Sequence, residues 1–417
     1  MHSRLQQARA RAALTQAQVG SALGVPREMV SMWENGTRTP GPEALSQLAK
    51  LYGASVQQLK DGPPEEGEAP DWEQQNRRVL SQIADCSTRA RDEAKREVER
   101  WTDFLDGWTR FLESVGAIEP GRVAPGRPPK EINEGFGITD ARRASTLART
   151  VRDHYSLGQD AIPDLYSFLD EAGVLVYKAS LGPLGEEETV SGAFYNHPRV
   201  GYSILVNVRC SEGRQAFTLA HEFAHALFHY PSQALVSVSG DDDPKERFAN
   251  AFAAHFLVPH RRLRELCRTE RRRSGSLSPF SALRFATYFR VSYLMMLFRL
   301  HEERQISREE VNTWKDYSPA RMAEQIGLNS SFLMSSKRPS ATSRRRTGLW
   351  RYPASVVVWI RDALRNDEVS PELTAEILQA DMAPQELKRE LLNIPERSRG
   401  EDEENLDEYP IRWRSID

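Results

Sequence analysis

The sequence predicts a multidomain, mainly α-helical protein with a small β-sheet in its central domain. Amphipathic helical patterns recur along most of the 417 residues, whereas short β-rich runs gather at 174–177, 191–195 and 202–207. Segments rich in proline and glycine at 61–67 and 116–137 interrupt these patterns. The chain is much longer than the roughly 150 residues of a typical domain, so we expect two or three cores.

The sequence divides into four predicted segments. They are an N-terminal helix-turn-helix domain over 1–62, a helical linker over 63–137, a central domain over 138–300 and a helical C-terminal extension with an acidic tail over 301–417. Within the central domain we expect helices over 139–155 and 162–173 before the strands begin. In the linker, an apolar stripe at helical spacing favours packing within the chain over a dimer contact. Its members are Trp101, Phe104, Leu105, Trp108 and Phe111.

The composition is that of a globular cytoplasmic protein, with 39% hydrophobic and 28% charged residues. The cysteines at 86, 210 and 267 are far apart and lack CxxC spacing, which argues against disulfides and cysteine metal sites. We expect no membrane contact, because there is neither a signal-peptide core nor a run of about 18 apolar residues. The net charge of −3 does not exclude nucleic-acid binding, since arginines cluster locally at 261–273 and 344–346.

Residues 14–36 show the spacing of a helix-turn-helix. Thr15 and Gln18 form a capping box, Gly24 provides a turn, and a second helix from Arg27 to Glu34 stops at Asn35-Gly36. One face of this second helix suits base contacts in a major groove, and other polar side chains suit phosphate contacts. The base-contact residues are Arg27, Glu28, Ser31 and Asn35, and the phosphate-contact residues are Gln16, Gln18 and Arg38. The same periodicity would equally suit a small bundle used for protein contacts.

Residues 4–61 resemble the XRE-type helix-turn-helix family throughout. The resemblance is carried by Leu14-Thr15-Gln16, Leu23-Gly24-Val25, Ser31, Glu34-Asn35-Gly36 and Pro40. It implies binding to double-stranded DNA. One such module buries little surface, so specific binding is expected to need a homodimer on a two-fold site.

An HExxH motif at 221–225 is the strongest chemical signal. His221 and His225 lie one turn apart on a helix, so both imidazoles can reach one tetrahedral zinc ion. Glu222 beside them can take a proton from a water whose pKa the metal has lowered, and pass it to a leaving amine. The motif therefore predicts peptide-bond hydrolysis.

A catalytic zinc needs a third protein ligand, and a second helix beginning near Pro244 offers Glu246. Asn250, one turn further, can hold the other ring nitrogen of a ligand histidine. His229 extends the face of His221 and His225 but lies too far along the axis to be the favoured ligand. We expect one zinc ion per chain, although two histidines and one carboxylate also suit manganese.

The segment from Arg214 to Glu222, together with Glu246 to Pro259, resembles the ImmA/IrrE family of metallopeptidases. The resemblance extends from about 138 to 300 and includes Ser191-Gly192 and the strand ending in Asn207. It implies His221, His225 and Glu246 as zinc ligands and Glu222 as catalytic base. It also implies cleavage of a partner repressor, often itself a helix-turn-helix protein, in stress response or mobile-element control.

The sequence thus predicts a DNA-binding regulator with zinc-dependent endopeptidase activity. The alternative hypothesis is a transcription factor without catalysis, in which a degenerate peptidase domain senses a metal or a ligand. Glu222 favours catalysis, because a structural zinc has no need of a carboxylate beside open water.

Overall fold

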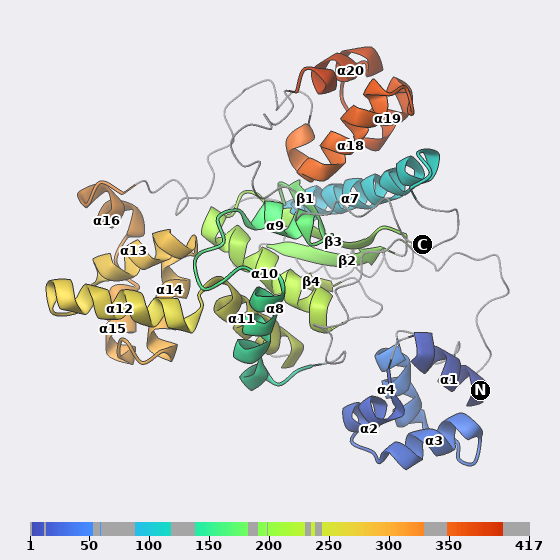
Figure 1. Ribbon diagram of the computed structural model, residues 1–417, viewed down its shortest axis with the longest axis horizontal. Coiled ribbons are helices and arrows are strands. Elements are labelled where there is room, and N and C mark those ends of the chain that lie inside the picture. Colours follow the sequence, from blue (N-terminus) through green and yellow to red (C-terminus); the bar gives the residue numbers. More distant parts are fainter. Residues whose placement is uncertain are drawn as a thin grey trace.

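The computed structural model describes residues 2–11, 14–52, 59, 88–117, 138–181, 191–197, 199–229, 235–237, 244–328 and 348–394. Over these residues the protein is mainly helical with one small sheet in the middle, as predicted (Figure 1). The predicted acidic tail and residues 63–87 and 118–137 of the predicted linker lie outside the described residues. None of the described helices combines the length and hydropathy needed to span a bilayer.

The N-terminal domain has its own apolar core, to which all of its described helices contribute. These helices are α1 (His2–Arg11), α2 (Gln16–Leu23), α3 (Arg27–Asn35) and α4 (Pro42–Tyr52). The predicted capping box is present, because Thr15 Oγ1 accepts the Gln18 N–H and the Gln18 side chain accepts the Thr15 N–H. Gly24 ends α2 with a left-handed φ of 68°, which turns the chain into α3. Helices α2 and α3 therefore form the predicted helix-turn-helix.

The central sheet has the strand order β1-β3-β2-β4. Its strands are β1 (Leu175–Ala179), β2 (Gly192–His197), β3 (Gly201–Asn207) and β4 (Leu235–Ser237). Strand β1 runs parallel to β3, whereas β2 runs antiparallel to both β3 and β4. The first three strands lie where the sequence predicts them. Strand β4 is not predicted by the sequence, because three residues are too few to show an alternating pattern.

Both faces of this sheet are buried, and neighbouring side chains alternate between them. Val176 and Ile204 belong to an apolar cluster on one face. The next residues along each strand, Tyr177 and Leu205, belong to a separate cluster on the other face. The sheet is therefore the middle layer of three.

The first face is covered by the helices that the sequence predicts around the HExxH motif. They are the short 3-10 helix η1 (Ala141–Arg143), α8 (Ala144–His154), α9 (Leu165–Glu171), α10 (Glu212–Phe228) and α11 (Pro244–Leu257). Asp140 caps η1 and Asp164 caps α9 by accepting backbone N–H groups, so both helices begin at polar residues. Helix α10 contacts β2, β3 and α11. The predicted helices over 139–155 and 162–173 are confirmed, with shorter bounds.

The second face is covered by helices that precede and follow the central domain in the sequence (Figure 1). They are α7 (Thr88–Ser114), the 3-10 helix η3 (Leu349–Arg351), α18 (Ala354–Arg365), α19 (Pro371–Ile377) and α20 (Pro384–Leu392). Trp101 Nε1 on α7 donates to Ser203 Oγ on β3 at 2.8 Å, and Ser203 Oγ donates to the Leu175 carbonyl at 2.8 Å. The apolar stripe of α7 therefore packs within the chain, as predicted, because it covers strands that would otherwise face solvent.

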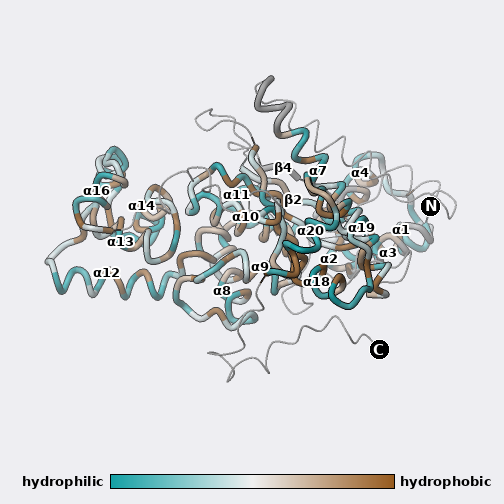
Figure 2. The backbone as a smooth tube through the Cα atoms, turned by 90° about the horizontal axis from the view of Figure 1, so that it is seen from above, coloured by the Kyte–Doolittle hydropathy of each residue, from teal (hydrophilic) through white to brown (hydrophobic). Residues whose placement is uncertain are grey.

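A third group of helices extends the first apolar cluster toward one end of the molecule (Figure 2). They are α12 (His260–Ser274), α13 (Pro279–Phe289), α14 (Tyr293–Glu302), α15 (Arg308–Trp314) and α16 (Pro319–Gln325). In Figure 2, α12 lies at the edge of this group and is hydrophilic along much of its length.

Candidate metal centre

The HExxH residues lie on α10, which begins at the capping residue Ser211 and runs through the core beneath the sheet. His221 is 5% exposed, and Glu222 and His225 are 0% exposed. Burial of three ionisable side chains on consecutive turns is costly unless each one has a partner. The core position of these residues therefore points to a site rather than to a solvated helix face.

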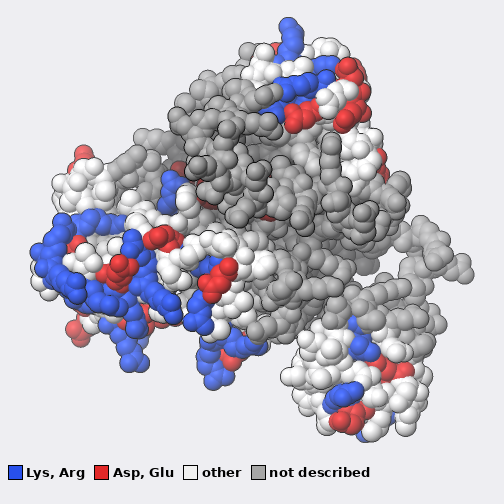
Figure 3. Space-filling model, in the orientation of Figure 1, with Lys and Arg blue, Asp and Glu red and all other residues white. Residues whose placement is uncertain are grey.

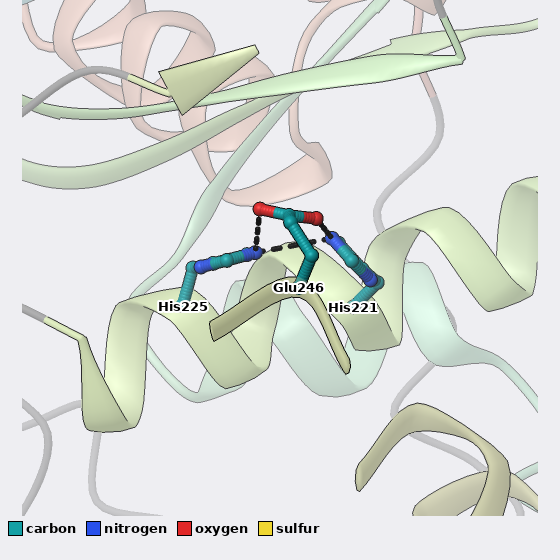
Figure 4. Close-up of side chains that lie close together, drawn as sticks. All are labelled: His221, His225 and Glu246. Atoms are coloured by element: carbon teal, nitrogen blue, oxygen red, sulfur yellow. Dashed lines mark hydrogen bonds and ion pairs between the residues drawn. The ribbon is translucent and has the colours of Figure 1, made fainter. Parts of the chain in front are cut away.

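Glu246, in the first turn of α11, meets both histidines (Figure 4). Its Oε2 lies 3.0 Å from His221 Nε2 and its Oε1 lies 3.1 Å from His225 Nε2. The two Nε2 atoms lie 3.0 Å apart, and the three ligand atoms lie within 4.8 Å of one another. The structure thus brings the three predicted ligands together from two helices, around a space of the size that one ion needs.

The electrostatics of this cluster favour a cation. Burial alone would raise the pKa of Glu246, but hydrogen bonds and charge from His221 and His225 lower it below its ordinary value. Burial alone would lower the pKa of His221, but Glu246 and the charge of Glu222 raise it. The pocket therefore stabilises positive charge between these groups. Two nitrogen ligands and a carboxylate suit zinc, so the residues present fit a divalent metal.

Each candidate ligand histidine has a second partner at its other ring nitrogen. His221 Nδ1 lies 2.9 Å from Asn250 Oδ1, the contact that the sequence predicts. His225 Nδ1 lies 2.8 Å from His229 Nδ1, and His229 Nε2 lies 2.7 Å from the Ile138 carbonyl oxygen. Such partners orient metal-binding rings. The sequence could not reveal this contact to Ile138, because it joins residues far apart in the chain.

Strand β2 passes close to Glu222. A Cβ added to Gly192 would lie 3.8 Å from Glu222 Oε1, 2.9 Å from the Leu205 carbonyl oxygen and only 2.5 Å from Thr218 Cγ2. The absence of a side chain at Gly192 therefore lets the strand approach α10 and its carboxylate.

Replacing Gly192 by alanine is expected to reduce stability by about 1–3 kcal/mol, because the added methyl overlaps Thr218 and the Leu205 carbonyl. Thermal unfolding of the variant measures the loss. Adding Thr218→Ser to the Gly192→Ala variant removes Thr218 Cγ2, the closest atom, and should restore part of the lost stability. A matched control is Gly41→Ala, because a Cβ there meets nothing within 4 Å. An unchanged melting temperature for Gly192→Ala would contradict the close approach.

His255 is not part of the metal cluster. Its Nε2 lies 3.1 Å from Glu302 Oε1 on α14, so it joins α11 to the third group of helices. It has the structural role that its position on the opposite side of the helix suggests.

The structure leaves the predicted DNA-contact side chains in different environments. Arg27, Glu28, Asn35 and Arg38 are exposed and Ser31 is half-buried. The two glutamines are engaged within the domain. Gln16 Nε2 donates to Glu34 Oε2 at 2.8 Å, and the Gln18 side chain completes the capping box of α2.

Glu34 is buried because Arg9 and Gln16 hold it. Arg9 Nε lies 2.5 Å from Glu34 Oε1, and the hydrogen bond to Glu34 raises the pKa of Arg9. This buried network joins α1, α2 and α3, and the hydrogen bond with Glu34 holds the side chain of Gln16 inside the domain. Of the predicted phosphate contacts, Arg38 has the exposed cationic side chain that such contacts need.

Comparison with known families gives two matches. Residues 169–301 match the IrrE N-terminal-like domain, which is peptidase family M78. Residues 5–59 match the helix-turn-helix family HTH_3. A search of curated proteins finds no match. The first match spans α10 and α11 with the metal cluster, and the second spans most of α1 and all of α2 to α4. The chain therefore joins an N-terminal helix-turn-helix domain of the XRE type to a central metallopeptidase-type domain of the ImmA/IrrE family.

Proposed function

We propose that this protein is a DNA-binding regulator whose central domain is a zinc-dependent endopeptidase that cleaves a partner transcriptional repressor. The observation that carries the proposal is the convergence of His221, His225 and Glu246 beside the buried carboxylate of Glu222. A structural zinc site is closed by four protein ligands, whereas a three-ligand site keeps a position open for chemistry.

In this proposal His221, His225 and Glu246 hold the metal, and Asn250 orients the ring of His221. Bound zinc acts as a Lewis acid that lowers the pKa of a nearby water and polarises a peptide carbonyl. Glu222 takes the proton of the attacking water and delivers it to the nitrogen of the leaving amine. Burial of Glu222 keeps bulk water away from this proton transfer.

The substrate class in this proposal is a helix-turn-helix repressor, because members of the resembled peptidase family cleave such partners. The N-terminal domain supports the same assignment. Its exposed α3 residues Arg27, Glu28 and Asn35 can enter a major groove, so the chain would act where a repressor is bound to DNA. We accordingly propose a cytoplasmic location for the protein.

Metal analysis of the purified full chain tests this proposal. We expect about one zinc per chain, and loss of the metal in His221→Ala and in Glu246→Ala, because two protein ligands hold zinc far more weakly than three. The matched control is His255→Ala, which removes a histidine of α11 that pairs with Glu302 instead. Wild-type protein without stoichiometric metal would rule out the peptidase proposal, and retention in both ligand variants would place the metal elsewhere.

A further inference from the structure

The hydrogen bonds around His229 have a direction that its neighbours determine. The Ile138 carbonyl oxygen, 2.7 Å from His229 Nε2, can only accept, so Nε2 must carry a proton and donate it. In the neutral ring this leaves His229 Nδ1 as an acceptor. His225 Nδ1, 2.8 Å away, must then be the donor. A neutral His225 with its proton on Nδ1 has its lone pair on Nε2, the atom that faces Glu246.

We infer that His229 is a positioning residue that keeps His225 in the tautomer able to bind the metal. His229 is 8% exposed and His225 is 0% exposed, which leaves little access for water as an alternative partner. On the other ligand, the Asn250 oxygen accepts from His221 Nδ1 in the same way. An acceptor at each Nδ1 atom therefore leaves both Nε2 atoms free to coordinate. This inference rests on the proposed metal site and adds a residue to it.

A pair of amide variants tests the role of the His229 Nδ1 atom. Asparagine at 229 places a carbonyl oxygen near the position of Nδ1, whereas glutamine places its amide near that of Nε2, toward Ile138. We expect His229→Asn to keep a zinc affinity close to the wild-type value, measured by chelator competition. Zinc affinity should fall about 10–100-fold in His229→Gln and in His229→Leu. A purely structural role would make the asparagine and glutamine variants similar.

Nitrogen chemical shifts of His225 in the metal-free full chain provide a readout that does not depend on zinc. We expect a proton on Nδ1 of His225 in wild type and in His229→Asn, whether or not Nε2 also donates a proton to Glu246, and a mixture of Nδ1–H and Nε2–H tautomers in His229→Leu. An Nε2–H tautomer in wild type, or equal zinc affinity in all three variants, would overturn the inference. Because the tautomer is read without metal, its failure can be told apart from a failure to bind zinc.

A different feature, the outer face of α12, carries a second inference. Figure 3 shows Lys and Arg side chains gathered over this helix. Arg261, Arg268 and Arg272 are exposed and lie at i, i+7 and i+11, so they share one face over about 16 Å. Among the described residues, no carboxylate forms an ion pair with any of these three.

Other arginines of the same helix are already paired. Arg262 Nε lies 2.9 Å from Asp160 Oδ1, Arg264 Nε lies 2.8 Å from Glu303 Oε2, and Arg273 Nη2 lies 3.2 Å from Glu270 Oε1. Glu265, an exposed carboxylate on α12 itself, is also paired, because its Oε2 lies 2.8 Å from Arg262 Nη1. The acidic groups on and next to α12 are therefore engaged by arginines other than Arg261, Arg268 and Arg272. Burial lowers the pKa of His260 at the start of the helix, and Arg261 and Arg264 lower it further.

We propose that this face of α12, defined by Arg261, Arg268 and Arg272, contacts the phosphate backbone of duplex DNA. Guanidinium groups bind phosphate oxygens in bidentate geometry. Three of them in a row can contact successive phosphates of a DNA strand, whereas a single acidic side chain could pair with only one of them. The N-terminal domain of the same chain raises the effective concentration of DNA at this face. The proposal extends the proposed DNA-binding function beyond the helix-turn-helix.

Salt dependence of binding to a labelled random-sequence duplex tests this surface, using the full chain. Replacing all three arginines by glutamine should reduce the slope of log Kobs against log salt by about 2.7, because each phosphate contact contributes about 0.9. A charge-matched control replaces three exposed arginines on other helices, and its slope should stay close to wild type. The control residues are Arg96, Arg149 and Arg321.

Arg27→Gln with Arg38→Gln separates this face from the helix-turn-helix. If the helix-turn-helix binds DNA, the double variant also reduces the salt slope. Combining it with the three α12 substitutions should then reduce the slope by the sum of the two separate reductions. An unchanged slope in the α12 variant would overturn the proposal whatever the helix-turn-helix does. Loss of binding to an acidic polypeptide but not to the duplex would also overturn it and assign the face to a protein partner.

Discussion

Replacing Glu222 by glutamine is expected to lower peptide cleavage by about 10²–10⁴-fold while about one zinc per chain remains bound. The glutamine amide fills the same buried space but cannot take a proton from water. The three metal ligands are untouched, so zinc content separates loss of chemistry from loss of the site. Retention of metal with loss of cleavage would assign Glu222 as the general base.

Cleavage can be measured before the substrate is identified. Labelling of new protein N-termini in cells that express wild type or Glu222→Gln identifies cuts that depend on this carboxylate, and a purified substrate then gives kcat/KM. Glu212→Gln, at the exposed start of the same helix, is the matched control and should cleave normally. Equal cleavage by wild type and Glu222→Gln would exclude the proposed base. A zinc-loaded wild type that produces no cuts would favour the non-catalytic sensor.

Replacing Arg152 by methionine is expected to destabilise the central domain by about 3–4 kcal/mol. Arg152 on α8 is 1% exposed and donates to the carbonyls of Gly158 at 2.9 Å, Phe256 at 2.6 Å and Asp160 at 2.5 Å. Burial lowers its pKa to about 10, so the side chain stays charged at neutral pH. Methionine fills similar volume but leaves these carbonyls without their donor, including the buried carbonyl of Phe256 near the end of α11.

Hydrogen exchange of peptides that cover α11 and residues 157–160 measures this effect locally, which avoids assigning one unfolding energy to a multidomain chain. We expect exchange about 10²–10³-fold faster in Arg152→Met. Arg149→Met is the control, because Arg149 is an exposed arginine of the same helix and its loss should change stability by less than about 0.5 kcal/mol. Equal exchange in both variants would show that the buried guanidinium does not support α11.

Local patterns were sufficient to predict much of the fold. Thr15 with Gln18 and the left-handed Gly24 are short-range signals, and α2 and α3 form where they lie. Strands β1 to β3 could be predicted because β-rich runs bounded by turns extend over at least four residues. Strand β4, with three residues, exists only through pairing with β2, so no local signal could reveal it.

In the metal cluster, the spacing of residues along the sequence predicts some of the contacts and tertiary packing decides the others. His221 and His225 share a face because of helix geometry, and any helix at this position would place them together. The contacts of both histidines with Glu246 depend on the packing of α11 against α10. The sequence could propose Glu246 from the chemistry that zinc requires, but the distance of 3.0 Å to His221 is a product of tertiary packing.

The sequence by itself determined most of the helical segments, strands β1 to β3, the helix-turn-helix and the chemical identity of the candidate ligands, because these depend on neighbours within a few residues. Tertiary structure decided which face of the sheet each helix covers and which hydrogen-bond partners the buried polar groups have. It placed α7 and the C-terminal helices on the second face of the sheet, and it brought the Ile138 carbonyl to His229. The physical reason is that a buried group is stabilised by the residues that contact it in the folded protein. These residues can lie anywhere in the sequence, so neighbours along the chain do not reveal them.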